Sequence, residues 1–217
     1  MSLSDIDIRI LGVMLEKERT TPEGYPLSIN SLVLACNQKT SREPVTDYSQ
    51  REVEDALQRL RDRGLVVSSQ AVSERVVKHQ HRLTHAFELG VQDFAVLAVL
   101  MLRGSQTAGE LRGRTERYTS FADVAAVDAS LRRLAAHKPP LARDEGRAPG
   151  QSQTRWVQTL GADPERQRPR VRQPSGEESG SEASEDRMTL ETLNREIETL
   201  KAKVAALMAH VGLAHDD

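Results

Sequence analysis

The sequence predicts a mainly α protein with small β wings, arranged as two tandem winged-helix domains plus a C-terminal coiled-coil helix. Three helical hydrophobic patterns with clear start signals precede a pair of short apolar stretches, and the same order then occurs a second time. The end of the chain carries a heptad pattern. We therefore expect winged-helix domains at 1–90 and 91–160, a disordered linker at 161–186 and a coiled-coil helix at 187–212.

The first predicted domain opens with two capped helices. Ser4 is a favourable N-cap residue with Asp7 at the third helical position, so we expect a helix from here to about Arg19. Ser28 caps a short second helix, whose apolar residues recur at helical spacing as far as Cys36. Both helices thus have one apolar face to bury against the rest of the domain.

The third helix of this domain has the clearest start signal in the chain. Ser49 and Glu52 are spaced as a capping box, and Gly64 is placed to end the helix in the left-handed conformation. Residues 65–67 and 75–83 read as two strands joined by a turn. Three helices followed by a two-stranded ribbon is the winged-helix order, a variant of the helix-turn-helix.

The second predicted domain follows the same order. An apolar helix ends at Gly104, and Thr107 with Glu110 forms another capping box for a short helix. The third helices of the two domains share a spacing of apolar residues, Val-x3-Leu-x2-Leu, that begins at Val53 and again at Val127. The expected helices and strands of this domain are 91–103, 107–112, 121–137, 141–143 and 155–160, with the wing tip at 146–150.

The linker is rich in Pro, Arg, Ser, Glu and Gly, which favours disorder. Mostly β-branched residues at heptad position a, with Leu at d, favour a parallel two-stranded coil and hence a homodimer. The alternative is a helix that packs on its own chain. The heptad residues are Leu190, Leu193, Ile197, Leu200, Val204, Leu207 and Val211.

Composition argues against several classes of protein. The chain has 217 residues and one cysteine, which excludes an internal disulfide and suits a reducing cytoplasm. The longest apolar run, 94–102, is about half of a membrane span, and no leader is apparent. Residues 91–160 carry ten basic and seven acidic residues, and this small positive excess does not by itself indicate nucleic-acid binding. We expect a cytoplasmic protein with no membrane partner.

We expect no catalytic site, metal site, cofactor or small-molecule substrate. Cys36 completes the apolar face of the second helix, and no histidine lies near it in sequence, so a buried structural cysteine is favoured over a nucleophile. His79 and His81 lack enough neighbouring ligands for a metal, with His85 as the nearest candidate, and are interpreted as surface residues of the wing. The chain contains no phosphate-binding glycine loop and no nucleophile elbow.

Several motifs together resemble the bacterial YceH family. They are YPLSIN at 25–30, ACNQKT at 35–40, REPV at 42–45, LRGSQT at 102–107, GELR at 109–112 and AHVG at 209–212. The resemblance covers the chain except for the linker, and implies two tandem winged helices without implying a biochemical activity. Both wing tips depart from the family pattern, with QAVSE at 70–74 and PGQSQT at 149–154, and neither departure favours phosphate contacts by the wings.

The helix-turn-helix geometry places candidate DNA contacts on three segments of the first domain. The turn before a recognition helix faces the duplex backbone, and the start of that helix reads bases. The predicted backbone contacts are Lys39, Thr40, Ser41 and Arg42 in the turn and Arg75, Lys78 and Arg82 in the wing; the predicted base-reading residues are Gln50 and Arg51. For the turn, a hydrogen-bonded loop that sets the angle between two helices is an equally good interpretation.

Charge patterning favours a different class of function. In the predicted recognition helix, Glu52, Glu54, Asp55 and Asp62 balance Arg51, Arg59, Arg61 and Arg63. Its counterpart in the second domain is rich in alanine and only mildly charged, which suits packing against protein. We therefore hold two hypotheses: a DNA-binding, transcription-regulator-like protein, placed first by analogy of fold, and a non-catalytic scaffold that docks a protein partner.

Overall fold

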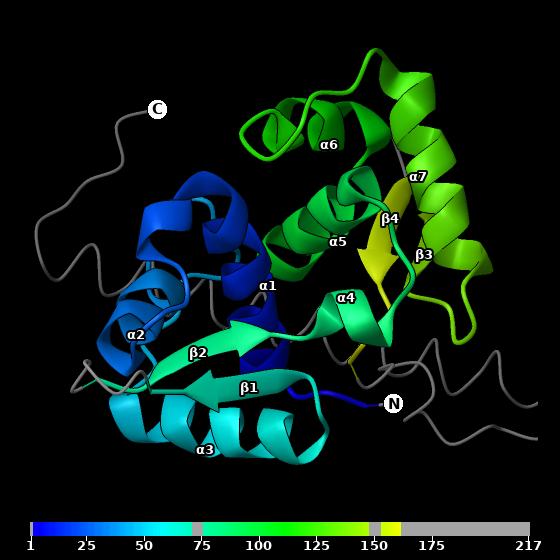
Figure 1. Cartoon of the computed structure of the whole chain (residues 1–217). Helices are drawn as coiled ribbons and strands as arrows, with labels where there is room; N and C mark the ends of the chain where they lie inside the picture. Colours follow the sequence, from blue (N-terminus) through cyan, green and yellow to red (C-terminus); the bar gives the residue numbers. More distant parts are fainter. Residues whose placement is uncertain (1, 71–75, 148–152, 162–217) are drawn as a thin grey trace, which may run out of the picture. The chain divides into compact units, whose positions relative to one another are not determined.

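The computed structural model describes residues 2–70, 76–147 and 153–161 (Figure 1). These residues belong to one compact unit, which is mainly helical, with seven α-helices and two small antiparallel strand pairs. The predicted linker and all heptad residues lie outside the described residues, so the coiled coil stays a prediction. None of the helices in the described ranges is both long and apolar enough to cross a membrane.

The first half of this unit, up to residue 90, has the expected order. Its elements are α1 (Asp5–Thr20), a 3-10 turn (Pro22–Gly24), α2 (Ile29–Cys36), α3 (Gln50–Asp62), β1 (Val66–Ser69), β2 (Lys78–His81) and the short α4 (Leu83–Ala86). The predicted capping boxes at Ser4 and Ser49 are both present, and Gly64 has a positive φ of 69°. The arrangement is compatible with a winged-helix fold.

The second half repeats the order. Its elements are α5 (Val91–Arg103), α6 (Ala108–Thr115), α7 (Val124–Ala136), β3 (Ala142–Gly146) and β4 (Arg155–Gln158). Thr107 caps α6 in the predicted box with Glu110. Each strand pair is antiparallel, and β3 and β4 contain a bulge between Asp144 and Gly146.

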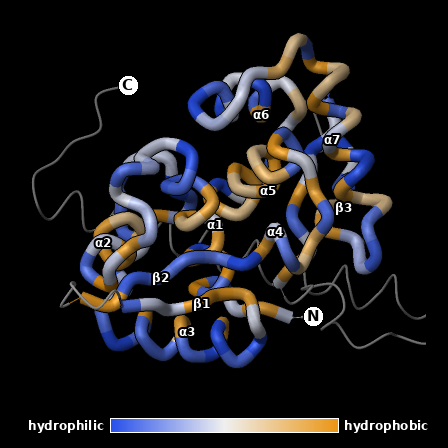
Figure 2. Tube along the Cα trace, in the orientation of Figure 1, coloured by the Kyte–Doolittle hydropathy of each residue, from blue (hydrophilic) through white to orange (hydrophobic). Residues whose placement is uncertain are grey.

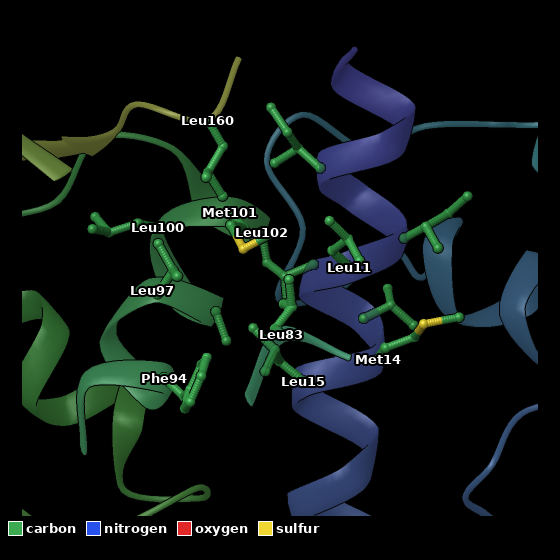
Figure 3. Close-up of a cluster of buried hydrophobic side chains, with 14 of the residues drawn as sticks. Leu11, Met14, Leu15, Leu83, Phe94, Leu97, Leu100, Met101, Leu102 and Leu160 are labelled. Atoms are coloured by element: carbon green, nitrogen blue, oxygen red, sulfur yellow. The ribbon is translucent and has the colours of Figure 1, made fainter. Parts of the chain in front are cut away.

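The core runs continuously between the two halves because α1 packs directly against α5. Figure 3 shows Leu11 and Leu15 of α1 next to buried side chains of α5, which include Leu97 and Leu102. Gly12 lets the helices approach closely, since a Cβ built there would lie 3.0 Å from Leu102. In Figure 2, α5 is mostly hydrophobic, whereas α3 and β2 are mostly hydrophilic.

Two expectations about the first wing need correction. The second strand is shorter than 75–83, because Leu83 begins α4. The two histidines of β2 are buried rather than on the surface: His79 is 6% exposed and His81 is 7% exposed. The main chain of His79 pairs with Leu27, and the amide of His81 donates to Tyr25 Oη at 2.9 Å, so this face of β2 is covered by the segment before α2.

Candidate functional site

The turn between α2 and α3 is fastened to the start of α3. The side chain of Asn37 donates to the Tyr48 carbonyl at 2.8 Å and accepts from the Tyr48 amide at 2.8 Å. Thr46 adds a bond from its hydroxyl to the Cys36 carbonyl at 3.2 Å. The beginning and end of the turn are therefore held together beside the N-terminal end of α3.

Five of the predicted DNA contacts lie toward this end of the first half. Lys39 and Thr40 are exposed in the turn, and Gln50 and Arg51 are exposed in the first turn of α3. In Figure 1, β1 runs back along α3. Lys78 pairs with Ser69 at the end of β1, so it lies toward the same end. We call Lys39, Thr40, Gln50, Arg51 and Lys78 the tip surface.

The other predicted contacts are placed differently. The Arg42 side chain is fully buried, so it is not available to a phosphate. Ser41 has a left-handed backbone (φ 60°), and its hydroxyl accepts from Arg103 at 2.7 Å. Arg82 is exposed but lies at the opposite end of β2, where its amide donates to the Leu65 carbonyl. Arg75 lies outside the described residues.

The later arginines of α3 are bound within the protein. Arg59 pairs with Asp7 at 2.8 Å rather than with Asp55 on its own helix, and Arg63 donates to the Ser2 carbonyl at 2.8 Å. Arg61 donates to Ser68 at 3.1 Å. The side-chain amides of Gln50 and Gln58 donate to carboxylates one turn away, those of Glu54 and Asp62. Beyond its first turn, α3 offers little unpaired positive charge to a duplex.

Arg42 organises a buried polar network where the two halves meet. Its guanidinium donates to the carbonyls of Ala35 (3.0 Å) and Ser41 (2.9 Å), to Gln38 (2.8 Å) and to the buried carboxylate of Glu16. The other carboxylate oxygen of Glu16 lies 3.4 Å from Arg117, which follows α6. The turn therefore joins α1 to the second half.

The same network brings together two of the segments that carry the family resemblance. The Glu43 amide donates to the Leu102 carbonyl at 2.8 Å, and Arg103 donates to Ser41. REPV (42–45) and LRGSQT (102–107) are therefore direct neighbours, although about 60 positions separate them in sequence. Packing between the halves accounts for Ser41 and Arg42 of this turn without a ligand.

Cys36 is buried, as expected. Burial raises the pKa of its thiol to about 12, so the reactive thiolate is suppressed at neutral pH. Its carbonyl accepts from Arg9, whose pKa is lowered by burial and then by the charge of Arg42. Within the ranges that the structure describes, no three His, Cys, Asp or Glu side chains gather in a way that could hold a metal ion.

Sequence reasoning missed a group of cations at the junction of the two halves. Lys17, Arg103, Arg114 and Arg117 come from the ends of α1, α5 and α6 and the turn after α6. They are up to 100 positions apart, so no local pattern reveals them. The only signal was the small positive balance of residues 91–160.

Comparison with known proteins places the chain in a family. Residues 3–151 match the family described as "Protein of unknown function, DUF480". The chain is 42% identical over 200 residues to a UPF0502 protein of Solibacter usitatus, covering 92% of this chain and 93% of the relative. It is 38% identical over 217 residues to a UPF0502 protein of Shewanella loihica, covering 97% of this chain and 100% of the relative. The chain therefore belongs to the DUF480, or UPF0502, family, which is the YceH family that its motifs resemble.

Proposed function

We propose that this protein is a DNA-binding, transcription-regulator-like protein built from two tandem winged-helix domains, 1–90 and 91–160. The observation that carries the proposal is the tip surface, where three segments distant in sequence place polar and basic side chains at the N-terminal end of α3. In helix-turn-helix modules this end of the recognition helix enters the major groove, and the preceding turn follows the backbone. The proposal includes no catalytic step and no cofactor.

The contacts divide by chemistry. Lys39, Thr40 and Lys78 would bind phosphates, and Arg51 would reach either a phosphate or a base edge. Gln50 would read a base only after giving up its bond to Glu54, which is 2.7 Å long. We leave Ser41, Arg42 and Arg82 out of the proposed contact set because of where they lie.

The second candidate function is a scaffold that docks a protein partner. It is supported by the surface of α3 beyond its first turn, by the surface of α7 and by one residue of α2. On α3 the later arginines are bound internally, as described above, and on α7 the exposed positions include Ala125, Ala129 and Ala136. Leu34 of α2 is 73% exposed, which is high for a large apolar side chain. Low charge and exposed apolar groups suit protein contact better than phosphate contact.

We also propose that the heptad at 190–211 joins two chains into a parallel dimer. A dimer would present two tip surfaces to one duplex, as two-fold symmetric regulators do. Analytical ultracentrifugation of the full chain tests this proposal directly. A dimer that becomes a monomer on Leu200→Asp substitution supports it, and a wild-type monomer at micromolar concentration contradicts it.

Fluorescence anisotropy on a random-sequence duplex tests the DNA proposal. The tip variant is Lys39→Gln, Arg51→Gln and Lys78→Gln. The matched control is Arg82→Gln, Arg132→Gln and Lys138→Gln, which removes the same charge from exposed positions elsewhere. We expect the tip variant to bind about tenfold more weakly, with a salt dependence reduced by roughly three phosphate contacts. Equal loss in both variants, or none in either, would refute the tip surface and favour the scaffold.

A further inference from the structure

The junction of the two halves holds more positive than negative charge. We call Lys17, Arg103, Arg114 and Arg117 the seam cluster. Arg117 is joined at 3.4 Å to Glu16 of the buried pair Glu16–Arg42, Lys17 and Arg103 interact with the charge of Arg42, and Arg114 interacts with Arg103. The Arg103 guanidinium is held by Ser41, and that of Arg117 lies 6.0 Å from the centre of the Tyr118 ring. The hydrogen bond to Ser41 orients the Arg103 guanidinium.

Carboxylates do not balance these cations. Glu16 is shared between Arg42 and Arg117, and Glu110 is shared between Arg114 (3.9 Å) and Arg155 (3.2 Å). Lys17 and Arg103 form no ion pair within the part of the chain that the structure describes. Glu43 and Glu116 are exposed in the adjoining turns, and neither is joined to the cluster by an ion pair within the same ranges.

The cations also act on one another. The pKa of Arg103 is lowered by burial and then by the charges of Arg114, Arg117 and Arg42. The pKa of Lys17 is lowered by burial and, less strongly, by Arg42 and Arg117, against the opposing charge of Glu16. Like charges held this close destabilise the fold unless an anion joins them. Arg117 is still 49% exposed, so its guanidinium is accessible from outside.

The tip surface lacks such an excess. Arg51 shares the start of α3 with the exposed carboxylates of Glu52 and Glu54, and Lys39 shares its turn with the exposed Asp47. Affinity for a duplex that does not depend on sequence comes from unbalanced positive charge. If the tip surface meets DNA, most of that charge must come from elsewhere on the protein.

We propose that the seam cluster is a phosphate-binding site. It would bind the phosphate backbone of the duplex next to the part that the tip surface contacts. This inference rests on the proposed function. The turn between α2 and α3 connects the two surfaces: Lys39 belongs to the tip, and Ser41 is bonded to Arg103 of the seam. Two residues of extended chain span at most about 7 Å, so the surfaces adjoin. Arginine forks match phosphate oxygens in two parallel hydrogen bonds, which favours phosphate as the ligand.

The same chemistry would also accept a small phosphorylated molecule, so the test uses two probes. One is inorganic tripolyphosphate, followed by the thermal unfolding midpoint of the full chain. The other is a random-sequence duplex, followed by anisotropy. The seam variant is Arg114→Gln with Arg117→Gln. A second variant, Lys17→Gln with Arg114→Gln, keeps the contact of Arg117 with Glu16 in case its loss prevents folding. The control is Arg132→Gln with Lys138→Gln, at exposed positions outside the seam.

We expect tripolyphosphate to raise the midpoint of the wild type and the control, and both seam variants to lose at least half of that shift. We expect both seam variants to bind the duplex about fivefold more weakly than the wild type. The salt dependence of the variant Arg114→Gln with Arg117→Gln should correspond to roughly two fewer phosphate contacts. Duplex binding that is unchanged in folded seam variants would overturn the inference and leave the proposed function standing. Protection by tripolyphosphate without duplex binding would overturn the proposed function and identify the seam as a site for a small phosphorylated ligand. No response to either probe would overturn both.

Discussion

Replacing Arg42 with methionine should strongly destabilise the protein. The Arg42 side chain is fully buried and makes four hydrogen bonds, to two carbonyls, Gln38 and Glu16. Methionine fills similar space but leaves Glu16, itself buried, with Arg117 at 3.4 Å as its one remaining ion-pair partner among the described residues. Breaking a buried ion pair on one side costs about 3–5 kcal/mol. Because Arg117 remains, we expect a loss of about 3 kcal/mol in the free energy of unfolding.

Urea denaturation at pH 7, followed by circular dichroism, measures this loss. The control Lys39→Met changes an exposed residue of the same turn and should shift the free energy by no more than about 0.5 kcal/mol. Adding Glu16→Gln to Arg42→Met removes the stranded charge, so the double variant should lose less than the sum of the single variants. A loss below about 1 kcal/mol for Arg42→Met, or strict additivity, would refute the role assigned to this network.

Three further predictions follow from single side chains. Gly12→Val should lower the free energy of unfolding in urea by about 1–3 kcal/mol, since any Cβ at this position lies 3.0 Å from Leu102. The control Gly113→Ala places its Cβ in open space and should not destabilise the protein. Cys36 should resist a thiol reagent at pH 7.5 until the protein is unfolded, because burial raises its pKa to about 12; rapid labelling of the native protein would contradict this. Burial lowers the pKa of His79 below its unfolded value of about 6.5. The free energy of unfolding should therefore fall as the pH drops from 7 to 5, by at most about 1.4 kcal/mol per pH unit. The His79→Gln variant should show a smaller fall over the same pH range.

Local signals in the sequence predicted the helices well. The capping boxes at Ser4, Ser49 and Thr107 involve residues three positions apart, so the sequence alone contains the whole interaction. Gly64 ends its helix with a positive φ for the same reason. The short helix α4 has no such signal, because the chain turns there to lead from the first strand pair into α5.

Side chains whose environment depends on distant segments were harder to predict. The alternation of β2 puts His79 and His81 on one face, but the segment that covers this face is about 50 positions earlier. Arg42 looks like an exposed cation in a polar turn, and only the position of Glu16 on α1 explains its burial. The seam cluster depends entirely on how α1 meets α5 and α6. Long-range packing therefore decides which basic residues remain available to a ligand.

The salt dependence of wild-type binding to a random-sequence duplex tests the account most directly. Seven cations are assigned to phosphates: Lys17, Lys39, Arg51, Lys78, Arg103, Arg114 and Arg117. The logarithm of the association constant should then fall with the logarithm of salt concentration with a slope of roughly −6. A slope near zero, or no binding at about 50 mM salt, would contradict phosphate contact by either the tip surface or the seam cluster.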